Sequence, residues 1–443
     1  MVGAGIAGLA AAVQLQRVAS EVLVVDASDR PGGVMRTDHV GGYVVERGPN
    51  TTQVKAPMLA ALREHGLDDA LLRAEPESRL RFLVREEQLV PLPVSPLGLA
   101  GTRLLSTRGK LRLLAEPFAR RGKTAGESVA EFVGRRLGRE AAEALVGPFL
   151  TGVYAGDERE LGAEAVFDRL VGLERRYGSI TVGAGLERLL RRGERGLRGS
   201  HSAAEGLGPF ARRISERLKE PPVLGATVIS ARREDGAWQV ALSTASGPSE
   251  LRAERLVLAL PAYAAAPLLA PSDEEAAHLL AGVAYAPIVT LPLGVEAAQL
   301  RRGVAGFGFL VPRAAGMALL GCLFMSRLFP GRAPKGHELL HCMLGGQRWP
   351  GAVEEPDDRL LDSARSELDR LLGLGAEPEL LGITRWPRAI PQPGRDHVGQ
   401  MRRLRERIAQ LGGLALAGGY LDGVSVADAF ASGLRAARDV AIS

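Results

Sequence analysis

Apolar and polar positions follow two different periods along the chain, and together they predict an α/β fold. An alanine-rich helical segment follows residue 5 and leads into the apolar run 22–25. Alternating residues predict a strand over 79–84, with a change of direction at 88–93. Further strands are predicted over 223–230, 238–242, 256–262, 284–295, 306–311, 319–324 and 414–419, where apolar runs are bounded by turn residues.

Turn residues indicate how these strands connect. Asp235-Gly236 between two strand-like runs is a strong signal for a β-hairpin. Residues 41–50 predict a turn, a short strand and a second turn, and the glycine- and arginine-rich stretch 191–208 predicts a loop. The strands from 284 onward are expected to form a second, largely antiparallel sheet. A helix is expected from 423–425 to Val440.

Residues 96–147 differ in composition from the segments before them, because leucines are interleaved with arginines and lysines. A helix with leucines on one side and cations on the other suits the boundary between lipid headgroups and acyl chains. The same pattern also fits a solvated basic face above a core stripe. Both interpretations stay open. In the first, the protein lies on a bilayer without crossing it.

Length and composition narrow the class of protein. A chain of 443 residues predicts about two or three domains. No signal peptide and no transmembrane helix is expected, since the best apolar run, 256–271, contains three prolines. The only two cysteines, Cys322 and Cys342, indicate a reducing cytosol. The net charge of +5 alone leaves nucleic acid, anionic lipid and acidic substrates open.

A glycine motif at the start of the chain carries the first chemical signal. Gly3, Gly5 and Gly8 form G-x-G-x-x-G at the opening of the first helix. Gly3 permits a tight turn, Gly5 lets backbone amides approach a pyrophosphate, and Gly8 allows close helix packing. The helix N-terminus then favours phosphate, and Asp26 lies near the offset of a carboxylate that binds a ribose hydroxyl. The motif predicts a dinucleotide cofactor without a 2′-phosphate.

Arg30, Gly32 and Gly33 follow Asp26, and this second motif resembles that of the FAD-dependent amine oxidase and protoporphyrinogen oxidase superfamily. The resemblance implies FAD as cofactor. One feature departs from it: the strand before Gly3 is reduced to Met1 and Val2. Either the start is set too late or the strand is truncated.

The resemblance also implies which further residues contact FAD. A G-x-x-x-E-x-G-P-like segment ending at Asn50 is expected to run under the flavin, and the C-terminal helix is expected to aim its N-terminus at the flavin ring. The backbone at Val228 is expected to meet the adenine. Cofactor contacts are therefore expected from Ile6, Ala7, Ala27, Val34, Gly48, Pro49, Asn50, Ala259, Gly418, Gly423, Val424, Ser425 and Val426.

Four more segments make the resemblance narrower. Residues 152–157, 284–288, 306–312 and 390–392 are similar to motifs of the protoporphyrinogen oxidase family, in the order found there. That family oxidises protoporphyrinogen IX to protoporphyrin IX with FAD and molecular oxygen and releases hydrogen peroxide. Some bacterial relatives act on coproporphyrinogen III instead. Another flavin amine oxidase or a desaturase is the remaining alternative of the same fold.

Five residues are expected to serve the substrate. The macrocycle is apolar with carboxylates on one side, so its pocket needs apolar walls and few cations. By the family pattern Phe307, Leu310 and Met343 are the walls, and Arg81 holds a propionate. Asn50 is expected near the reacting carbon. Several positions depart from the family pattern, among them Glu205, Pro393, Ser425 and Ala429.

The expected architecture is a discontinuous Rossmann-like FAD-binding domain, an inserted substrate-binding domain with a mixed or antiparallel sheet, and a helical membrane-binding domain. Residues 1–74, 205–283 and 384–443 are assigned to the first, 75–93 and 284–383 to the second, and 94–204 to the third. The resemblance implies a cytoplasmic protein, peripheral and monotopic on the inner face of the cell membrane, with no nucleic-acid partner. The oligomeric state is open, a homodimer included.

Two hypotheses of other classes remain. Residues 337–341 match H-E-x-x-H, the zinc metalloprotease signature, which requires a helix carrying both histidines on one face. The flanking glycines leave little room for such a helix, the family pattern predicts a strand here, and no residue is assigned to a metal. A flavin-free porphyrin carrier is the second hypothesis.

Overall fold

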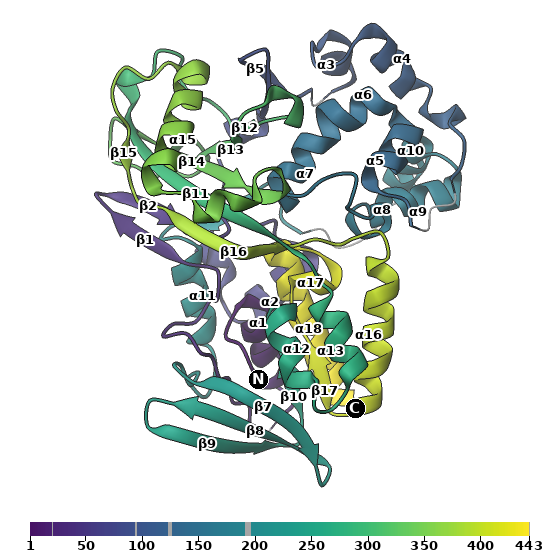
Figure 1. The fold of residues 1–443 in the computed structure, drawn as a ribbon, viewed down its shortest axis with the longest axis vertical. Coiled ribbons are helices and arrows are strands. Elements are labelled where there is room, and N and C mark those ends of the chain that lie inside the picture. The colour runs from purple at the N-terminus through teal and green to yellow at the C-terminus, as the bar shows by residue number, and fades with distance from the viewer. Residues whose placement is uncertain (20, 94, 123–125, 191–195, 443) are drawn as a thin grey trace.

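The computed structural model describes residues 1–443 except 20, 94, 123–125, 191–195 and 443. A parallel sheet joins segments from both ends of the chain (Figure 1). Its order is Val223, Val25, Val2, β10 (Leu256–Leu258) and β17 (Leu414–Leu416). The short first strand is paired on both sides, since the Val2 amide donates to Val257 O at 2.9 Å and Val25 N donates to Met1 O at 2.9 Å.

Helices cover both faces of this sheet. Leucine and alanine side chains of α1 (Ile6–Leu15), α2 (Ala56–Glu64), α11 (Leu207–Ser215) and α18 (Val426–Ile442) form one core with it. Side chains of α12 (Ala262–Leu269), α13 (Glu274–Ala281) and α16 (His397–Leu411) form the other. α1 and α18 lie side by side, and a Cβ on Gly433 would collide with the carbonyl of Ala7. The two chain ends are therefore packed together.

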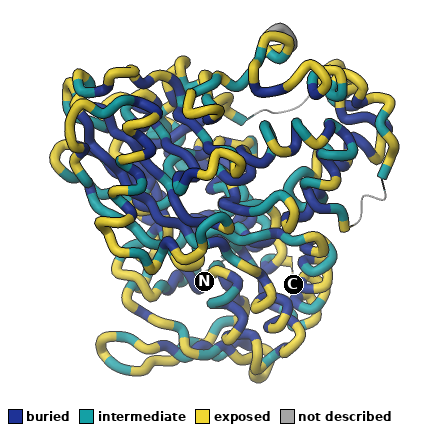
Figure 2. The backbone as a smooth tube through the Cα atoms, turned by 45° about the horizontal axis from the view of Figure 1, so that its top comes forward, coloured by how far each residue is buried: buried dark blue, intermediate teal, exposed yellow. Residues whose placement is uncertain are grey.

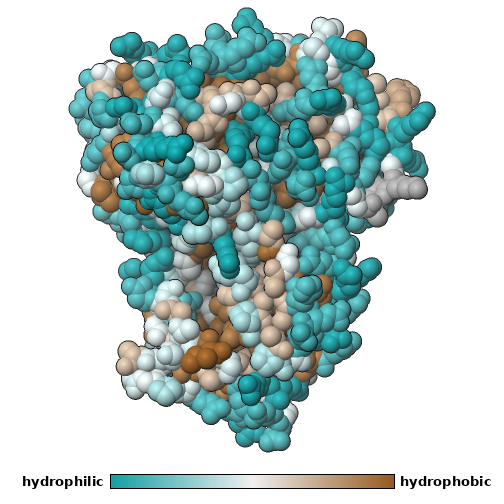
Figure 3. Space-filling view, viewed as in Figure 1, coloured by the Kyte–Doolittle hydropathy of each residue, from teal (hydrophilic) through white to brown (hydrophobic). Residues whose placement is uncertain are grey.

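A small antiparallel sheet of β7 (Thr227–Glu234), β8 (Ala237–Thr244) and β9 (Gly247–Ala253) lies at the lower end of Figure 1. Asp235 and Gly236 both have positive φ, 50° and 79°, as a tight hairpin turn requires. The predicted hairpin is confirmed. Figure 3 shows an apolar group on the surface just above this sheet.

The larger sheet has the order β15-β11-β14-β13-β12-β4-β5, and β16 also pairs with β11. All its pairs are antiparallel except β12 with β4, so the expected largely antiparallel sheet is confirmed. The strands are β4 (Phe82–Arg85), β5 (Gln88–Pro91), β11 (Tyr285–Glu296), β12 (Gly308–Leu310), β13 (Leu319–Phe324), β14 (His337–Gly345), β15 (Glu379–Leu380) and β16 (Thr384–Pro391).

The two faces of the larger sheet have different cover. α15 (Asp357–Leu372) packs on one face over a core that includes Phe309 and Cys342. The hairpin of β1 (Thr37–Val40) and β2 (Tyr43–Glu46) packs on the other, through Tyr43 and Val45. Figure 2 shows long buried stretches in the part of the molecule that holds this sheet, and residues 288–295 of β11 are all buried.

Residues 96–190 form the helical part at the upper right of Figure 1. Its elements are α3 (Pro96–Gly101), α4 (Thr107–Leu114), η3 (Glu116–Phe118), α5 (Val129–Leu137), α6 (Arg139–Ala141), the π-helical η4 (Ala142–Val146), α7 (Gly147–Tyr154), α8 (Ala163–Val166), α9 (Asp168–Tyr177) and α10 (Ile180–Leu190). Among the described residues, no helix has the length and hydropathy needed to cross a membrane.

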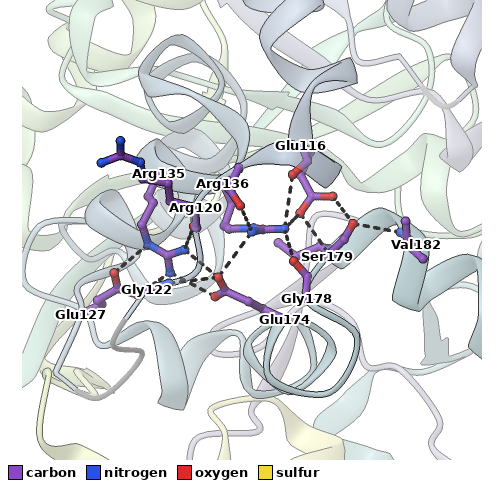
Figure 4. A network of polar contacts seen from close by, with 12 residues as sticks. Glu116, Arg120, Gly122, Glu127, Arg135, Arg136, Glu174, Gly178, Ser179 and Val182 are labelled. Atoms are coloured by element: carbon purple, nitrogen blue, oxygen red, sulfur yellow. Dashed lines mark hydrogen bonds and ion pairs between the residues drawn. The ribbon is translucent and has the colours of Figure 1, made fainter.

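A buried ion network holds this helical part together (Figure 4). Arg136 of α5 pairs with Glu116 of η3, and both side chains are fully buried. The Glu116 carboxylate also accepts hydrogen bonds from the hydroxyl of Ser179 at 2.6 Å and the amide of Ile180 at 2.9 Å. Arg135 pairs with Glu174 at 2.6 Å. η3 is therefore fixed to α5 and to the start of α10.

Two short-range predictions were wrong. The strand expected over 79–84 is β4, because Pro76–Arg79 form a 3₁₀ turn, and the chain turns at Glu86 and Glu87 rather than at 88–93. Part of the loop expected over 191–208 lies outside the described residues (191–195), but His201–Ala203 form β6, paired with β3 (Leu71–Arg73), and α11 starts at Leu207. The remaining short elements are η1 (Asp68–Ala70), η5 (Ala297–Gln299), η6 (Arg313–Ala315), α14 (Met325–Leu328), η7 (Gly346–Arg348), η8 (Pro350–Glu354) and α17 (Gly419–Asp422).

Candidate functional site

The first glycine loop lies between the parallel sheet and α1. Gly3 has φ +104°, and a Cβ there would strike the carbonyl of Ala259. A Cβ on Gly8 would strike the carbonyl of Gly3. A Cβ on Gly5, in contrast, would meet no protein atom within 4 Å. Gly3 and Gly8 are thus required by the fold, whereas Gly5 leaves open space at the N-terminus of α1, where a phosphate is stabilised.

The second glycine loop packs directly on the first. The Gly32 amide donates to the carbonyl of Ala4 at 2.8 Å. Arg30 closes this loop, since its guanidinium donates to the carbonyls of Gly33 at 2.9 Å and Met35 at 3.0 Å. Arg30 therefore supports the loop rather than pointing freely at a ligand. Val34, the next residue in the loop, is exposed.

Asp26 lies at the end of the second parallel segment and links three parts of the site. Its carboxylate accepts from the amides of Ala4 at 2.6 Å and Ser28 at 2.8 Å. A carboxylate offers about four acceptor positions, so two amides leave room for ribose hydroxyls. The Ala226 amide donates to Asp26 O at 2.9 Å, which places Val228 at the start of β7 beside this corner. Ala27 is exposed at the same corner.

The C-terminal segment reaches the site through β17 and α18. The Gly418 amide, just after β17, donates to Ser432 Oγ of α18 at 2.9 Å. Ser425 caps α18: its hydroxyl accepts from the amide of Asp428 at 3.1 Å and donates to the Asp428 carboxylate at 2.5 Å. Gly423 and Val424 precede this cap, and Val426 is the first helical residue. The packing of α18 on α1, through Ile6 and Ala7 among others, brings both ends of the chain to one place.

Residues 47–50 connect the glycine loops to the larger sheet. Gly48 passes so close to Val34 that a Cβ would strike the Val34 carbonyl. The Arg47 carbonyl accepts from the indole nitrogen of Trp386 in β16 at 2.8 Å. After Pro49, the side-chain oxygen of Asn50 is buried and has no hydrogen-bond partner among the described residues. Protein atoms therefore cover this oxygen in the ligand-free chain.

The predicted substrate residues lie on the larger sheet. Leu310 of β12 pairs with Gly321 of β13, and Gly321 pairs with Met343 of β14. Leu310 and Met343 therefore lie in one row on either side of Gly321, and the Leu310 side chain covers the glycine, since a Cβ on Gly321 would lie 3.0 Å from Leu310 Cδ2. Leu310 also touches α7, where a Cβ on Gly152 would lie 2.6 Å from Leu310 Cδ2.

Arg81 and Phe307 form the edge of this region. The guanidinium carbon of Arg81 lies 4.4 Å from the centre of the Phe307 ring. The Phe307 amide donates to Leu80 O at 2.7 Å, which fixes the two segments side by side. The structure thus places Leu310 close to Met343 and Arg81 against Phe307.

Sequence reasoning missed two polar residues of the same sheet face, Thr290 and His341. Thr290 of β11 lies directly opposite Met343, and His341 lies two residues before it on β14. Alternation along 337–345 was the signal, because it puts residues 339, 341 and 343 on one face. The H-E-x-x-H hypothesis is wrong, since this segment is a strand, on which the two histidines are about 13 Å apart.

Comparison with known proteins identifies the family to which this chain belongs. The model of the family described as flavin containing amine oxidoreductase matches residues 6–441. The chain is 32% identical to the chloroplastic protoporphyrinogen oxidase of Oryza sativa subsp. japonica, over 96% of this chain and 84% of the rice protein. It is 26% identical to the coproporphyrinogen III oxidase of Bacillus subtilis (strain 168), over 99% of this chain and 97% of that one.

Solved structures show the same fold. A candidate protoporphyrinogen oxidase from Exiguobacterium sp. 255-15 superposes with a TM-score of 0.82 at 25% identity, covering 100% of this chain and 98% of that one. A reduced UDP-galactopyranose mutase superposes with a TM-score of 0.73 at 15% identity, covering 99% and 94%. The second likeness concerns the fold alone.

Proposed function

Because the chain belongs to the family of flavin-containing amine oxidoreductases, we propose that it oxidises protoporphyrinogen IX to protoporphyrin IX. FAD is its cofactor, and in this proposal molecular oxygen is the final acceptor and hydrogen peroxide is released. Bound FAD supplies the hydride acceptor for this chemistry. The likeness to protoporphyrinogen oxidases over 96% of the chain supports the substrate class.

One arrangement carries the proposal for the substrate. Leu310 and Met343 lie in one row on either side of Gly321, where the Leu310 side chain covers the glycine, and the Arg81 guanidinium lies against the Phe307 ring. An apolar macrocycle needs such a flat apolar surface, and its propionates need a cation at one edge only. In this proposal the glycine loops and Asp26 hold the nucleotide, and Asn50 lies near the reacting carbon.

The test begins with the visible spectrum of the purified protein, which should show bound flavin. The protein is then incubated in air with protoporphyrinogen IX, and porphyrin fluorescence is compared with an autoxidation blank. We expect fluorescence above the blank, equimolar peroxide per electron pair, and loss of turnover under nitrogen. Bound flavin with no porphyrin fluorescence above the blank would contradict the proposed reaction. Turnover that persists under nitrogen would show that oxygen is not the required electron acceptor.

Coproporphyrinogen III is the second candidate substrate, because the Bacillus subtilis relative is named for it. Coproporphyrinogen III carries propionates on all four rings, so it needs cations at more than one edge. Arg81 provides one edge. Arg47, on the hairpin side of the sheet, is already engaged by Asp38 at 2.8 Å and by Leu381 O at 2.9 Å. We therefore expect the higher kcat/KM with protoporphyrinogen IX in parallel assays.

The proposal includes peripheral attachment to the inner face of the cell membrane. Leu111, Leu114 and Phe118 are exposed, the last by 89%, and their spacing places them along one side of α4 and η3. Arg108 and Arg120 flank them and form no ion pair with an acid in the part of the chain described. Exposed apolar side chains beside free cations fit an anionic lipid surface.

Vesicle flotation tests this attachment. We expect the protein to float with vesicles of phosphatidylcholine and phosphatidylglycerol, and less with phosphatidylcholine alone. A triple change to serine at 111, 114 and 118 should abolish flotation, while Ile229→Ser, at an exposed isoleucine on β7, should not. Flotation of the triple variant at the wild-type level would refute the patch. Light scattering on the same protein preparation without vesicles tests whether the protein is a homodimer.

A further inference from the structure

The C-terminal end of α7 meets the larger sheet in a strained turn (Figure 1). Ala155, the residue after the helix, has φ +49°, in the left-handed region that residues other than glycine seldom adopt. The Ala155 carbonyl accepts from the Gln347 amide at 2.8 Å. A Cβ on Gly346 would strike the same carbonyl. The chain just after β14 therefore holds one side of this turn.

Gln392, the residue after β16, holds the other side of the turn. Its side-chain amide nitrogen donates to the carbonyls of Tyr154 at 2.7 Å and Ile390 at 3.0 Å. Because both partners are carbonyls, the nitrogen and not the oxygen of the amide has to face them. The amide oxygen lies over Gly156, where a Cβ would be 2.6 Å from it. The residues on both sides of Ala155 are therefore matched to this one side chain.

The last turn of α7 also sets the position of Leu310. A Cβ on Gly152 would lie 2.6 Å from Leu310 Cδ2, and a Cβ on Gly321 would lie 3.0 Å from the same atom. The end of the Leu310 side chain is therefore held between α7 and β13. Gly152 and Tyr154 lie in one helical turn, so a movement of the Tyr154 carbonyl also moves the surface against which Leu310 packs. Leu310 itself is only half-buried.

We propose that Gln392 is a positioning residue for the substrate, which holds the last turn of α7 so that Leu310 keeps one orientation toward the macrocycle. This inference rests on the proposed function. Without the Gln392 amide, the Tyr154 carbonyl loses a partner and the strained turn at Ala155 is free to relax. Leu310 then has more than one orientation, and binding has to select one of them. The effect falls on KM, because an apolar wall contacts the substrate without exchanging protons with it.

Steady-state kinetics of the FAD-loaded enzyme with protoporphyrinogen IX in air test this inference. Gln392→Ala should raise KM about three- to tenfold, the range of one lost hydrogen bond, and change kcat less than about twofold. Gln392→Glu keeps the length of the side chain but places an acceptor beside two carbonyls, so it should raise KM at least as much. In a Leu310→Ala background, Gln392→Ala should raise KM no further, because the side chain through which it acts is gone.

Gln400→Ala is the matched control. The half-buried Gln400 amide of α16 donates to Leu279 O of α13 at 2.6 Å, so this change removes the same kind of bond elsewhere in the fold and should leave KM at the wild-type value. If Gln392→Ala does not fold, Gln392→Glu carries the test. Wild-type KM in the Gln392 variants, an equal rise in Gln400→Ala, or a further rise in the Leu310→Ala background would overturn the inference. A flavin-loaded wild type that does not oxidise protoporphyrinogen IX would refute the proposed function, and this inference with it.

Discussion

The guanidinium of Arg81 lies 4.4 Å from the centre of the Phe307 ring, a distance at which a cation is attracted to an aromatic face. The two residues come from segments far apart in the sequence, and the hydrogen bond from Phe307 N to Leu80 O joins them. The ring holds the guanidinium in place without using its N–H donors. Those donors remain available for a carboxylate.

This relationship predicts the effect of removing the cation. Arg81→Ala should raise the KM for protoporphyrinogen IX about ten- to one-hundredfold, the range of one lost charge-assisted hydrogen bond, and change kcat much less. Arg81→Lys should fall between, because lysine keeps the charge but loses the planar fork. Steady-state kinetics measure both. Arg79→Ala, at an exposed arginine two residues earlier, is the control, and a similar rise in KM there would argue against a specific contact.

The glycine loop predicts two opposite outcomes for the same substitution. Gly5 has φ −68° and open space around it, so Gly5→Ala should fold with a melting temperature close to that of the wild-type apoprotein. The methyl group should still occupy the phosphate position, and FAD content measured at 450 nm should fall sharply. Gly8→Ala should instead prevent folding, because its Cβ meets the Gly3 carbonyl, and it should yield little folded protein. Stoichiometric FAD in Gly5→Ala would place the pyrophosphate elsewhere.

The sequence predicted most where local chemistry decides the structure. Asp235-Gly236 set the β7–β8 turn, because few residue pairs adopt positive φ at both positions. The turn at Glu86 and Glu87 was missed for the same reason, since non-glycine residues seldom take their φ values of 51° and 57°. β6 was missed because its three residues are stabilised only by pairing with the distant β3.

In the candidate site, too, local features were predicted from the sequence and features that depend on distant contacts were missed. Gly3, Gly5, Gly8 and Asp26 lie within one βαβ unit, so their spacing predicts how they come together. His341 and Thr290 were missed because their place on the same face as Met343 depends on the register of β11 and β14, which no short motif encodes. The pairing of Glu116 with Arg136 was missed because a run of cations predicts an exposed face, and tertiary contacts bury this one arginine.

That buried pair predicts a pH-dependent stability. Burial alone would raise the pKa of Glu116, but hydrogen bonds from Ser179, Thr181 and Ile180 lower it to about 2. The unfolded state therefore binds the proton first as pH falls below about 4.5. The contribution of Glu116 is complete above that pH and is lost as pH falls toward 2.

Urea unfolding at pH 7 and pH 3.5 checks this. Glu116→Gln should lose about 3–5 kcal/mol of unfolding free energy at pH 7, because Arg136 is left buried without its charge partner. The variant should then lose less than wild type on going to pH 3.5. Glu143→Gln, in the exposed pair with Arg139, should leave both midpoints nearly unchanged. Equal pH dependence in wild type and Glu116→Gln would contradict the assignment.

Ser425 predicts a stability effect without a redox effect. Its hydroxyl accepts from the Asp428 amide and donates to the Asp428 carboxylate, which also pairs with Lys55. Both functions of the hydroxyl are therefore engaged at the start of α18. Ser425→Ala should lower the free energy of unfolding by about 1 kcal/mol, and Ser425→Gly by a few tenths, because glycine is tolerated at a helix N-cap.

The midpoint potential of the flavin should be the same in Ser425→Ala and Ser425→Gly as in wild type. With its hydrogen committed to Asp428, the Ser425 hydroxyl has none to donate to the flavin ring, so replacing it leaves the stabilisation of the reduced ring to the backbone of α18. Thermal denaturation and dye-coupled measurement of the midpoint potential test the two halves separately. A potential shift above about 30 mV in Ser425→Ala, equivalent to roughly 1.4 kcal/mol for two electrons, would show that the hydroxyl turns from Asp428 to the flavin when FAD is bound.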